Sequence, residues 1–151
     1  MKRIIGLDIG DNRIGISVSD ALNLTAQPVG VIRRNGWGPD ARSIREIADR
    51  WETDTLLCGL PKNMDGSEGF QAHKVREMAQ YLSGCGFIVI FQDERLSTVA
   101  AERILHESGM THKTQRNVVD CAAAMIILQN YLDFLNLKKN EEEGDSEHER
   151  K

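Results

Sequence analysis

Long apolar runs are absent from this 151-residue sequence. No segment approaches the roughly 20 consecutive apolar residues that a helix needs to cross a bilayer. The amino terminus is basic and then apolar, as in a secretion signal, but Asp8 and Asp11 interrupt it before the apolar part of a signal peptide is complete. The sequence therefore predicts a cytoplasmic protein that does not contact membranes.

Cysteine is scarce in the chain. The three cysteines, Cys58, Cys85 and Cys121, are odd in number, far apart and embedded in apolar runs, which predicts reduced and buried thiols rather than disulfides. None of them stands near a second cysteine or a histidine at the spacing of a zinc site. A structural zinc is therefore not expected.

An excess of basic residues, which is common in nucleic-acid-binding proteins, is missing as well. Lysine and arginine together number 19 against 23 acidic residues, and the formal net charge is −4. Part of this negative charge lies in residues 138–151, which hold six acidic and four basic residues. The overall charge counts against nucleic acid as a partner, although it leaves room for a local basic patch.

The apolar pattern of the chain is that of one α/β domain. The predicted strands are 4–9, 13–18, 26–34, 55–60 and 87–91, and the predicted helices are 40–51, 70–82, 97–108 and 114–137. The first three strands form an antiparallel meander, with Pro28 typical of an edge strand, and the later strands are joined by helical crossovers. We expect a three-layer domain over 1–137 with a mixed five-stranded sheet, and a disordered charged tail over 138–151. Phe70 and Val75 are among the helix residues expected to face the sheet.

Three acidic residues stand where apolar residues are expected. Asp8 lies on the first strand, Glu94 follows the last strand, and Asp120 interrupts an apolar helix. Open α/β sheets bind ligands at the carboxyl ends of their parallel strands, where these acids could meet. Clustered carboxylates repel one another unless a divalent cation neutralises them, and oxygen-rich sites suit Mg²⁺ or Mn²⁺. Two such ions about 4 Å apart activate water and stabilise the leaving oxygen in phosphodiester hydrolysis.

The acids also have structural interpretations. Asp120 could pair with Lys113 or Arg116 on its own helix face. Asp93 and Glu94 point to opposite faces of their strand, because side chains alternate along a strand. The residues alone leave open which of these two acids faces a site.

Four motifs, in this order along the chain, resemble those of the YqgF/RuvX family. They are IGLDIGDNRIG at 5–15, GLPKNMDG at 59–66, DERLST at 93–98 and VDCAAAMIILQ at 119–129. The resemblance extends over about residues 3–135. It implies a ribonuclease H-like fold related to the Holliday-junction resolvase RuvC. The family is described as a pre-16S rRNA nuclease and also as a junction resolvase.

The resemblance assigns the family's catalytic and metal-binding acids to Asp8, Glu94 and Asp120. In this way it favours Glu94 over Asp93. With these assignments the resemblance implies a site for Mg²⁺ or Mn²⁺ at which two metal ions act.

The sequence departs from the family pattern beside the helix acid. Val118 stands where the family often has lysine, and Cys121 stands where it often has serine. Lys113 and Arg116, one turn earlier, could supply the positive charge that Val118 lacks.

Several polar residues are candidates for contacts to phosphate. The loop after strand 55–60 could hold phosphate through its backbone N–H groups and polar side chains, or it could be a plain turn. Its candidate residues are Lys62, Asn63, Gly66 and Ser67. Arg95 could contact phosphate or pair with the neighbouring Glu94. Further candidates for contacts to backbone phosphates are Arg33, Arg34, Arg103, Lys113 and Arg116.

The sequence thus predicts a metal-dependent endonuclease that acts on nucleic acid. Its substrate is pre-16S rRNA at the 5′ end, in ribosome biogenesis and in association with ribosomal particles, or else branched DNA. Two other interpretations stay open: a non-catalytic protein that binds nucleic acid, the ribosome or the transcription machinery, and an actin-like nucleotide-binding domain. The actin-like domain needs two lobes, which 151 residues do not supply. Monomer and homodimer are both compatible with the sequence, although junction resolution requires two cuts and therefore a dimer.

Overall fold

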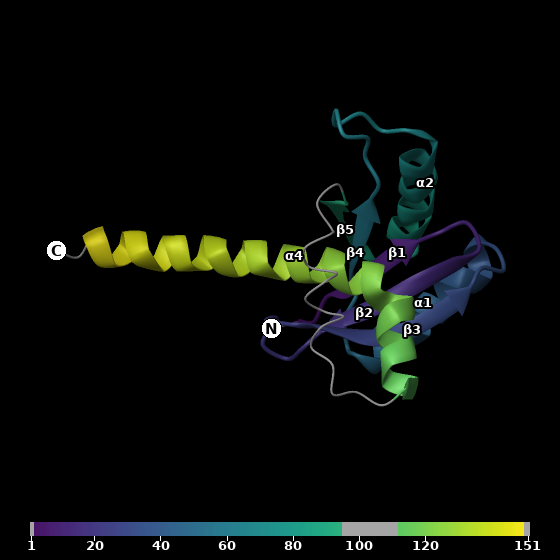
Figure 1. Ribbon diagram of the computed structural model, residues 1–151, viewed down its shortest axis with the longest axis horizontal. Helices are drawn as coiled ribbons and strands as arrows, with labels where there is room; N and C mark the ends of the chain where they lie inside the picture. Colours follow the sequence, from purple (N-terminus) through teal and green to yellow (C-terminus); the bar gives the residue numbers. More distant parts are fainter. Residues whose placement is uncertain (1, 95–111, 150–151) are drawn as a thin grey trace.

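Five strands form one mixed sheet in the computed structural model, which describes residues 2–94 and 112–149, without the side chains of 112–119 and 143–149. The strands are β1 (Ile5–Ile9), β2 (Arg13–Ser19), β3 (Ala26–Arg33), β4 (Thr55–Leu60) and β5 (Ile88–Asp93). Their order is β3-β2-β1-β4-β5, antiparallel among the first three and parallel among β1, β4 and β5 (Figure 1). The predicted mixed sheet is therefore confirmed. The predicted helix 97–108 lies outside the described residues.

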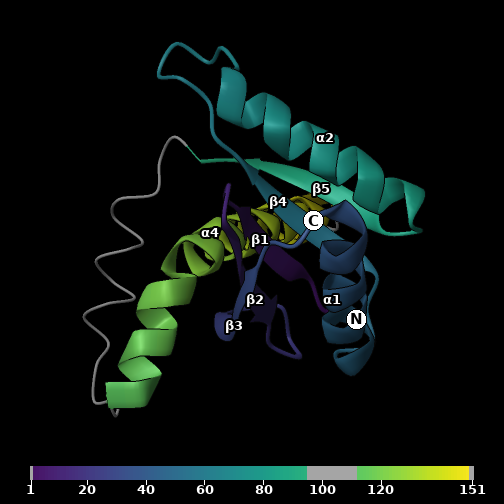
Figure 2. The ribbon, with the colours of Figure 1, turned by 90° about the vertical axis from the view of Figure 1, so that its right-hand side faces the viewer.

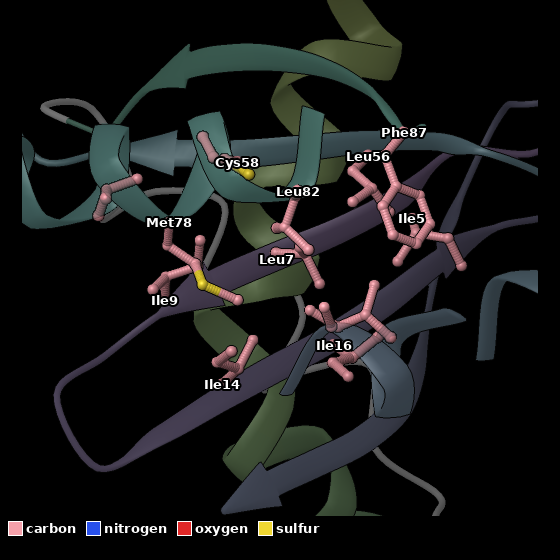
Figure 3. Packing of buried hydrophobic residues seen from close by; sticks show 14 of the residues in the cluster. Ile5, Leu7, Ile9, Ile14, Ile16, Leu56, Cys58, Met78, Leu82 and Phe87 are labelled. Atoms are coloured by element: carbon pink, nitrogen blue, oxygen red, sulfur yellow. The ribbon is translucent and has the colours of Figure 1, made fainter. Parts of the chain in front are cut away.

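Helices cover both faces of the sheet (Figure 2). They are α1 (Trp37–Arg50), α2 (Phe70–Gly84) and α4 (His112–Glu149). On the face covered by α1 and α2, Leu7 packs with Met78 and Leu82 in the larger core cluster (Figure 3). On the opposite face, Leu57 packs with Leu128 of α4 in a second cluster. Each fully buried side chain of this size contributes about 1.5–3 kcal/mol, so both helical layers are held by apolar burial.

Side chains of β1 alternate between these two layers. Leu7 and Ile9 belong to the core under α1 and α2, whereas Gly6 and Asp8 face α4. A Cβ atom at Gly6 would come within 3.0 Å of the Ala124 carbonyl oxygen of α4. The backbone of α4 therefore lies directly against β1, on the same face as Asp8.

The edge strand β3 carries Pro28, which confirms the edge position predicted from that residue. Its pairing with β2 is interrupted by a bulge. Ile16 pairs with Gly30 while Ser17 pairs with Pro28, so Val29 is the extra residue.

Two apolar expectations are wrong. Phe70, predicted to face the sheet, is 73% exposed, because it lies one turn before Lys74 on the outer face of α2, where the Lys74 ammonium stands over its ring. Cys85 is exposed because it follows the last turn of α2. Cys58 and Cys121 are buried as predicted, and none of the three cysteines forms a disulfide with another described residue.

Helix α1 begins at Trp37, three residues before the predicted start at Asp40. The Asp40 carboxylate is buried in the first turn, where it accepts the Asn35 N–H at 2.9 Å and the Arg34 Nε–H at 3.2 Å. The acid therefore ties the incoming chain to the helix start rather than capping the helix from outside.

Helix α4 continues to Glu149, whereas composition predicted disorder over 138–151. Lysine and glutamate are good helix formers, and Lys138 and Glu142 stand four residues apart. Side chains 137–142 are all exposed, so local propensity rather than packing forms this part of α4. In the ranges that the structure describes, no helix combines the length and the apolarity needed to cross a bilayer.

Candidate active site

The strand register shows which acid of the Asp93–Glu94 pair faces α4. In β5, Val89 packs toward the core under α1 and α2, while Ile90 packs toward the core under α4. Because the side-chain period of a strand is two, Glu94 shares the α4 face with Ile90, and Asp93 faces the other layer. Glu94 therefore lies on the same face of the sheet as Asp8.

Glycines make room for the two carboxylates between the sheet and α4. A Cβ atom at Gly59 of β4 would overlap both the Glu94 carboxylate and the Ile127 side chain of α4. Asp8 pairs with Gly15 of β2, and a Cβ atom at Gly15 would stand 3.8 Å from the Asp8 Cβ. The sheet positions beside the acids are therefore bare of side chains.

The surroundings of the two acids favour their protonated forms. Burial, then the Asp8 charge and then the Asp93 charge raise the pKa of Glu94 to about 7. Burial also raises the pKa of Asp8, against the opposing effect of the Arg13 guanidinium. In the described part of the chain, no hydrogen bond or ion pair to either carboxylate offsets this cost. A cation bound at this position would stabilise both ionised acids.

The backbone of Asp120 lies near the strand partner of Asp8, but its side chain does not complete a cluster. Its carbonyl oxygen is 3.5 Å from a Cβ atom placed at Gly15, the strand partner of Asp8, and its side chain is exposed. Among the described residues, no three acidic, histidine or cysteine side chains stand close enough together to hold a metal ion. The side chains of Lys113 and Arg116, proposed as helix partners of Asp120, lie outside the described set.

The donor atoms at this position fit a hard divalent cation. Asp8 and Glu94 offer carboxylate oxygens, which Mg²⁺ and Mn²⁺ prefer. The buried Cys58 thiol of the neighbouring strand belongs to the opposite core, and burial raises its pKa to about 12. No soft ligand from β4 therefore competes for the site, and the pair of carboxylates suits magnesium or manganese.

Sequence comparison places the chain in a family. Residues 2–134 match the profile of the RuvX family, described as Holliday junction resolvase. The chain belongs to the RuvX family. A protein of Clostridium botulinum strain Hall is 46% identical over 135 residues, covering 89% of this chain and 98% of that protein. A protein of Halothermothrix orenii is 45% identical, covering 89% and 96%. Both relatives are named "Putative pre-16S rRNA nuclease".

Solved structures confirm the ribonuclease H-like fold that the resemblance implied for this RuvX protein. Thermus thermophilus RuvC in complex with a Holliday junction substrate superposes with a TM-score of 0.59 at 12% identity, covering 91% of this chain and 97% of RuvC. The Fowlpox virus resolvase, in complex with Holliday junction DNA, superposes with a TM-score of 0.56 at 15% identity, covering 88% and 98%. At these identities the likeness concerns the fold.

The loop after β4 of the RuvX chain is built as a self-bonded turn. Lys62 and Glu68 form an isolated antiparallel bridge. The Asn63 side-chain amide donates to the Ser67 hydroxyl at 2.9 Å, and that hydroxyl donates to the Asp65 carboxylate at 2.6 Å. These bonds use the polar groups of Asn63 and Ser67 within the loop, which favours the plain-turn interpretation over phosphate binding.

The arginines proposed for phosphate contacts fall into separate groups. Arg34 is held by the Asp40 carboxylate at 3.2 Å and by the Gly10 carbonyl at 3.0 Å, so its guanidinium serves the fold. Arg33 is exposed at the end of β3, opposite Arg13 of β2. The candidates Arg95 and Arg103 lie outside the described residues.

Arg13 was not among the residues that sequence reasoning selected. It reads as an ordinary polar position of an alternating strand, and only the register shows that it shares the face of Asp8. The sequence shows only that Arg13 shares a strand face with Gly15, two residues later; the pairing of Gly15 with Asp8 comes from the register.

Proposed function

We propose that this RuvX-family chain is a metal-dependent endonuclease that hydrolyses phosphodiester bonds in the 5′-end maturation of pre-16S rRNA, in the cytoplasm and on ribosomal precursor particles. The observation that carries the proposal is the placement of Asp8 and Glu94 on one sheet face, within electrostatic reach of each other and, among the described residues, without a hydrogen bond or ion pair to either carboxylate. The choice of substrate is supported by relatives that match almost the full length of the domain and are named for that RNA.

In this proposal Asp8 and Glu94 hold the divalent cation, and Asp120 from α4 serves as a further ligand. The chemistry supplied by bound Mg²⁺ or Mn²⁺ is activation of water and stabilisation of the leaving oxygen. The chain positions its acids rigidly: Asp8 sits in β1 between two paired strands, and the Glu94 N–H donates to the Leu60 carbonyl at 3.2 Å. Partial burial of both acids strengthens their attraction for a cation, because charges interact more strongly away from water.

Two other functions are distinguished by experiment. The description of the family as a junction resolvase favours branched DNA as the alternative substrate. The exposed Asp120, which does not close a three-acid cluster, favours a non-catalytic nucleic-acid-binding role. A resolvase must make two symmetric cuts and therefore acts as a dimer, whereas trimming one RNA strand requires a single site.

The test is cleavage of a labelled pre-16S 5′ leader RNA and of a four-way DNA junction, each with Mg²⁺ and with Mn²⁺. We expect cleavage of the RNA, and a loss of about 100-fold or more in the rate for Asp8→Asn, because a metal site supplies several kcal/mol of transition-state stabilisation. Asp49→Asn, an exposed aspartate of α1, is the matched control and should cleave at the wild-type rate.

The outcomes separate the candidates. Cleavage of the junction but not of the RNA, by a protein that is dimeric in solution, would replace the rRNA assignment with the resolvase one. Equal cleavage by wild-type protein and Asp8→Asn would show that the acids are not the catalytic site. Absence of cleavage with retained nucleic-acid binding would establish the non-catalytic role.

A further inference from the structure

Two arginines stand directly opposite each other where β2 begins and β3 ends. Arg13 pairs with Arg33 in the antiparallel register, and both side chains are exposed. The next pair along the ladder, Asn12 with Arg34, is hydrogen-bonded, since the Arg34 N–H donates to the Asn12 carbonyl at 2.9 Å. Arg13 and Arg33 are therefore a non-hydrogen-bonded pair, the type in which Cα atoms approach to about 4.5 Å and side chains lie closest.

This pairing does not stabilise the fold. Like charges directly opposite each other in a sheet are destabilising. In the part of the chain that the structure describes, neither guanidinium has a carboxylate within ion-pair distance. Arg34 shows the contrast, because the buried Asp40 carboxylate neutralises it at 3.2 Å. Two adjacent guanidinium groups that form no ion pair with any described carboxylate indicate an anionic ligand.

The arginine pair lies in line with the two acids. Arg13 has the same strand parity as Gly15, the partner of Asp8, so it faces α4 as Asp8 does. Its charge reaches Asp8, whose pKa it lowers against the effect of burial. Because the strand order is β5-β4-β1-β2-β3, Glu94, Asp8, Arg13 and Arg33 follow one another across a single face of the sheet.

We propose that Arg13 and Arg33 form a binding site for the backbone phosphates of the nucleic-acid strand that is presented to Asp8 and Glu94. The statement that the bound strand runs toward Asp8 and Glu94 rests on the proposed nuclease function. Binding of phosphate by the two arginines requires no catalysis. Guanidinium groups bind phosphate oxygens through paired hydrogen bonds, and contacts of this kind fix the register of a strand without reading its sequence. The pair also provides a local basic patch in a chain of net charge −4.

The test measures binding rather than cleavage, so that it does not depend on the proposed activity. A fluorescent single-stranded RNA and a fluorescent four-way DNA junction are titrated with metal-free protein at several salt concentrations. The variant is Arg13→Gln with Arg33→Gln, and the charge-matched control is Arg42→Gln with Arg50→Gln, two exposed arginines of α1.

We expect the variant at β2 and β3 to bind on the order of tenfold or more weakly. The slope of log Kd against log salt should fall by about 1.4 for the RNA and about 1.8 for the junction, the values for loss of two phosphate contacts. The control variant should keep the wild-type slope. Replacing Arg13 and Arg33 by lysine should restore the slope, because the charge that displaces counterions returns.

A second readout separates binding from folding. Removing one charge by Arg33→Gln should raise the melting temperature of the nucleic-acid-free protein slightly while weakening binding, because the repulsion with Arg13 is relieved. Equal salt slopes for the β2–β3 variant and the α1 control would overturn the proposal. The two proposals can fail separately. If only the β2–β3 variant loses binding while the wild-type protein cleaves neither the RNA nor the junction, the phosphate site is upheld and the nuclease function is refuted.

Discussion

The surroundings of the Glu94 side chain disfavour its ionised form. Burial, the Asp8 charge and the Asp93 charge raise its pKa from the ordinary value to about 7. Between about pH 4.5 and 7 the folded state therefore binds more protons at Glu94 than the unfolded chain does. The contribution of Glu94 to the stability of the metal-free protein should therefore fall as pH rises through this interval, and its full penalty is present above pH 7.

Glu94→Gln should remove this penalty. In metal-free protein, the melting temperature of the variant relative to wild type should be more favourable at pH 8 than at pH 5. The expected difference is about 2–4 °C, which corresponds to about 1 kcal/mol after allowance for solvent screening of a partly exposed group. Thermal melts at both pH values in the presence of a chelator measure it, with Glu46→Gln, an exposed glutamate of α1, as the control. The raised pKa would be contradicted if the melting temperature of Glu94→Gln, relative to that of wild type, were lower at pH 8 than at pH 5.

Single residues show why the sequence predicted part of the site but not all of it. Asp8 stands out because an acid in an apolar strand is unusual. Glu94 could not be separated from Asp93 by pattern alone, since the choice depends on how β5 pairs with β4. Arg34 looked available for phosphate because its partner Asp40 comes from a helix start whose position depends on tertiary contacts.

At the scale of elements, α4 determines the shape of the site. It crosses β1 and β2 closely because Gly6 and Gly15 present no side chain there. The Ser17 hydroxyl of β2 donates to the Ala124 carbonyl of α4 at 2.8 Å in a buried position, which fixes the helix along the sheet. Asp120 comes to the neighbourhood of Asp8 through this crossing.

Gly59→Ala tests the packing between β4, Glu94 and α4. The added methyl group would overlap the Glu94 carboxylate and the Ile127 side chain, so the free energy of unfolding should fall by about 1–3 kcal/mol. Gly84→Ala is the matched control: a Cβ atom at this last residue of α2 meets nothing within 4 Å. It should leave stability unchanged or raise it by up to about 0.5 kcal/mol. Urea denaturation measures both, and equal stability of Gly59→Ala and wild type would mean that Glu94 does not lie over β4.

Elements were easier to predict from sequence than their boundaries. The apolar run of β4 identified a buried parallel strand directly, because both faces of this strand are covered. The apolar run of β5 identified a parallel strand, but β5 lies at the edge of the sheet and its side chains are half-buried or exposed. Phe70 was misplaced because it is apolar and begins a helix, although helical geometry sets it beside Lys74 on the outer face. The start of α1 was misplaced because a buried Asp40 can bond backward to Asn35 from inside the first turn.

At the scale of the whole molecule, the last part of α4 projects away from the three-layer domain (Figure 1). Leu132 is fully buried against the sheet, and Leu135 packs against the same cluster. From residue 137 to residue 142 every side chain is exposed. The folded domain is therefore expected to end near Leu137, although the helix does not.

Truncation after Leu137 should leave the melting temperature within about 1 °C of wild type, because none of the exposed side chains just beyond it is buried on folding. It also removes six acidic and four basic residues, so binding of single-stranded RNA at low salt should be unchanged or slightly tighter. The matched control is truncation after Tyr131, which also removes the buried Leu132 and should cost about 2–5 kcal/mol or more. If truncation after Leu137 lowered the melting temperature by several degrees, residues 138–151 would belong to the folded domain. The boundary at residue 137 would then be wrong.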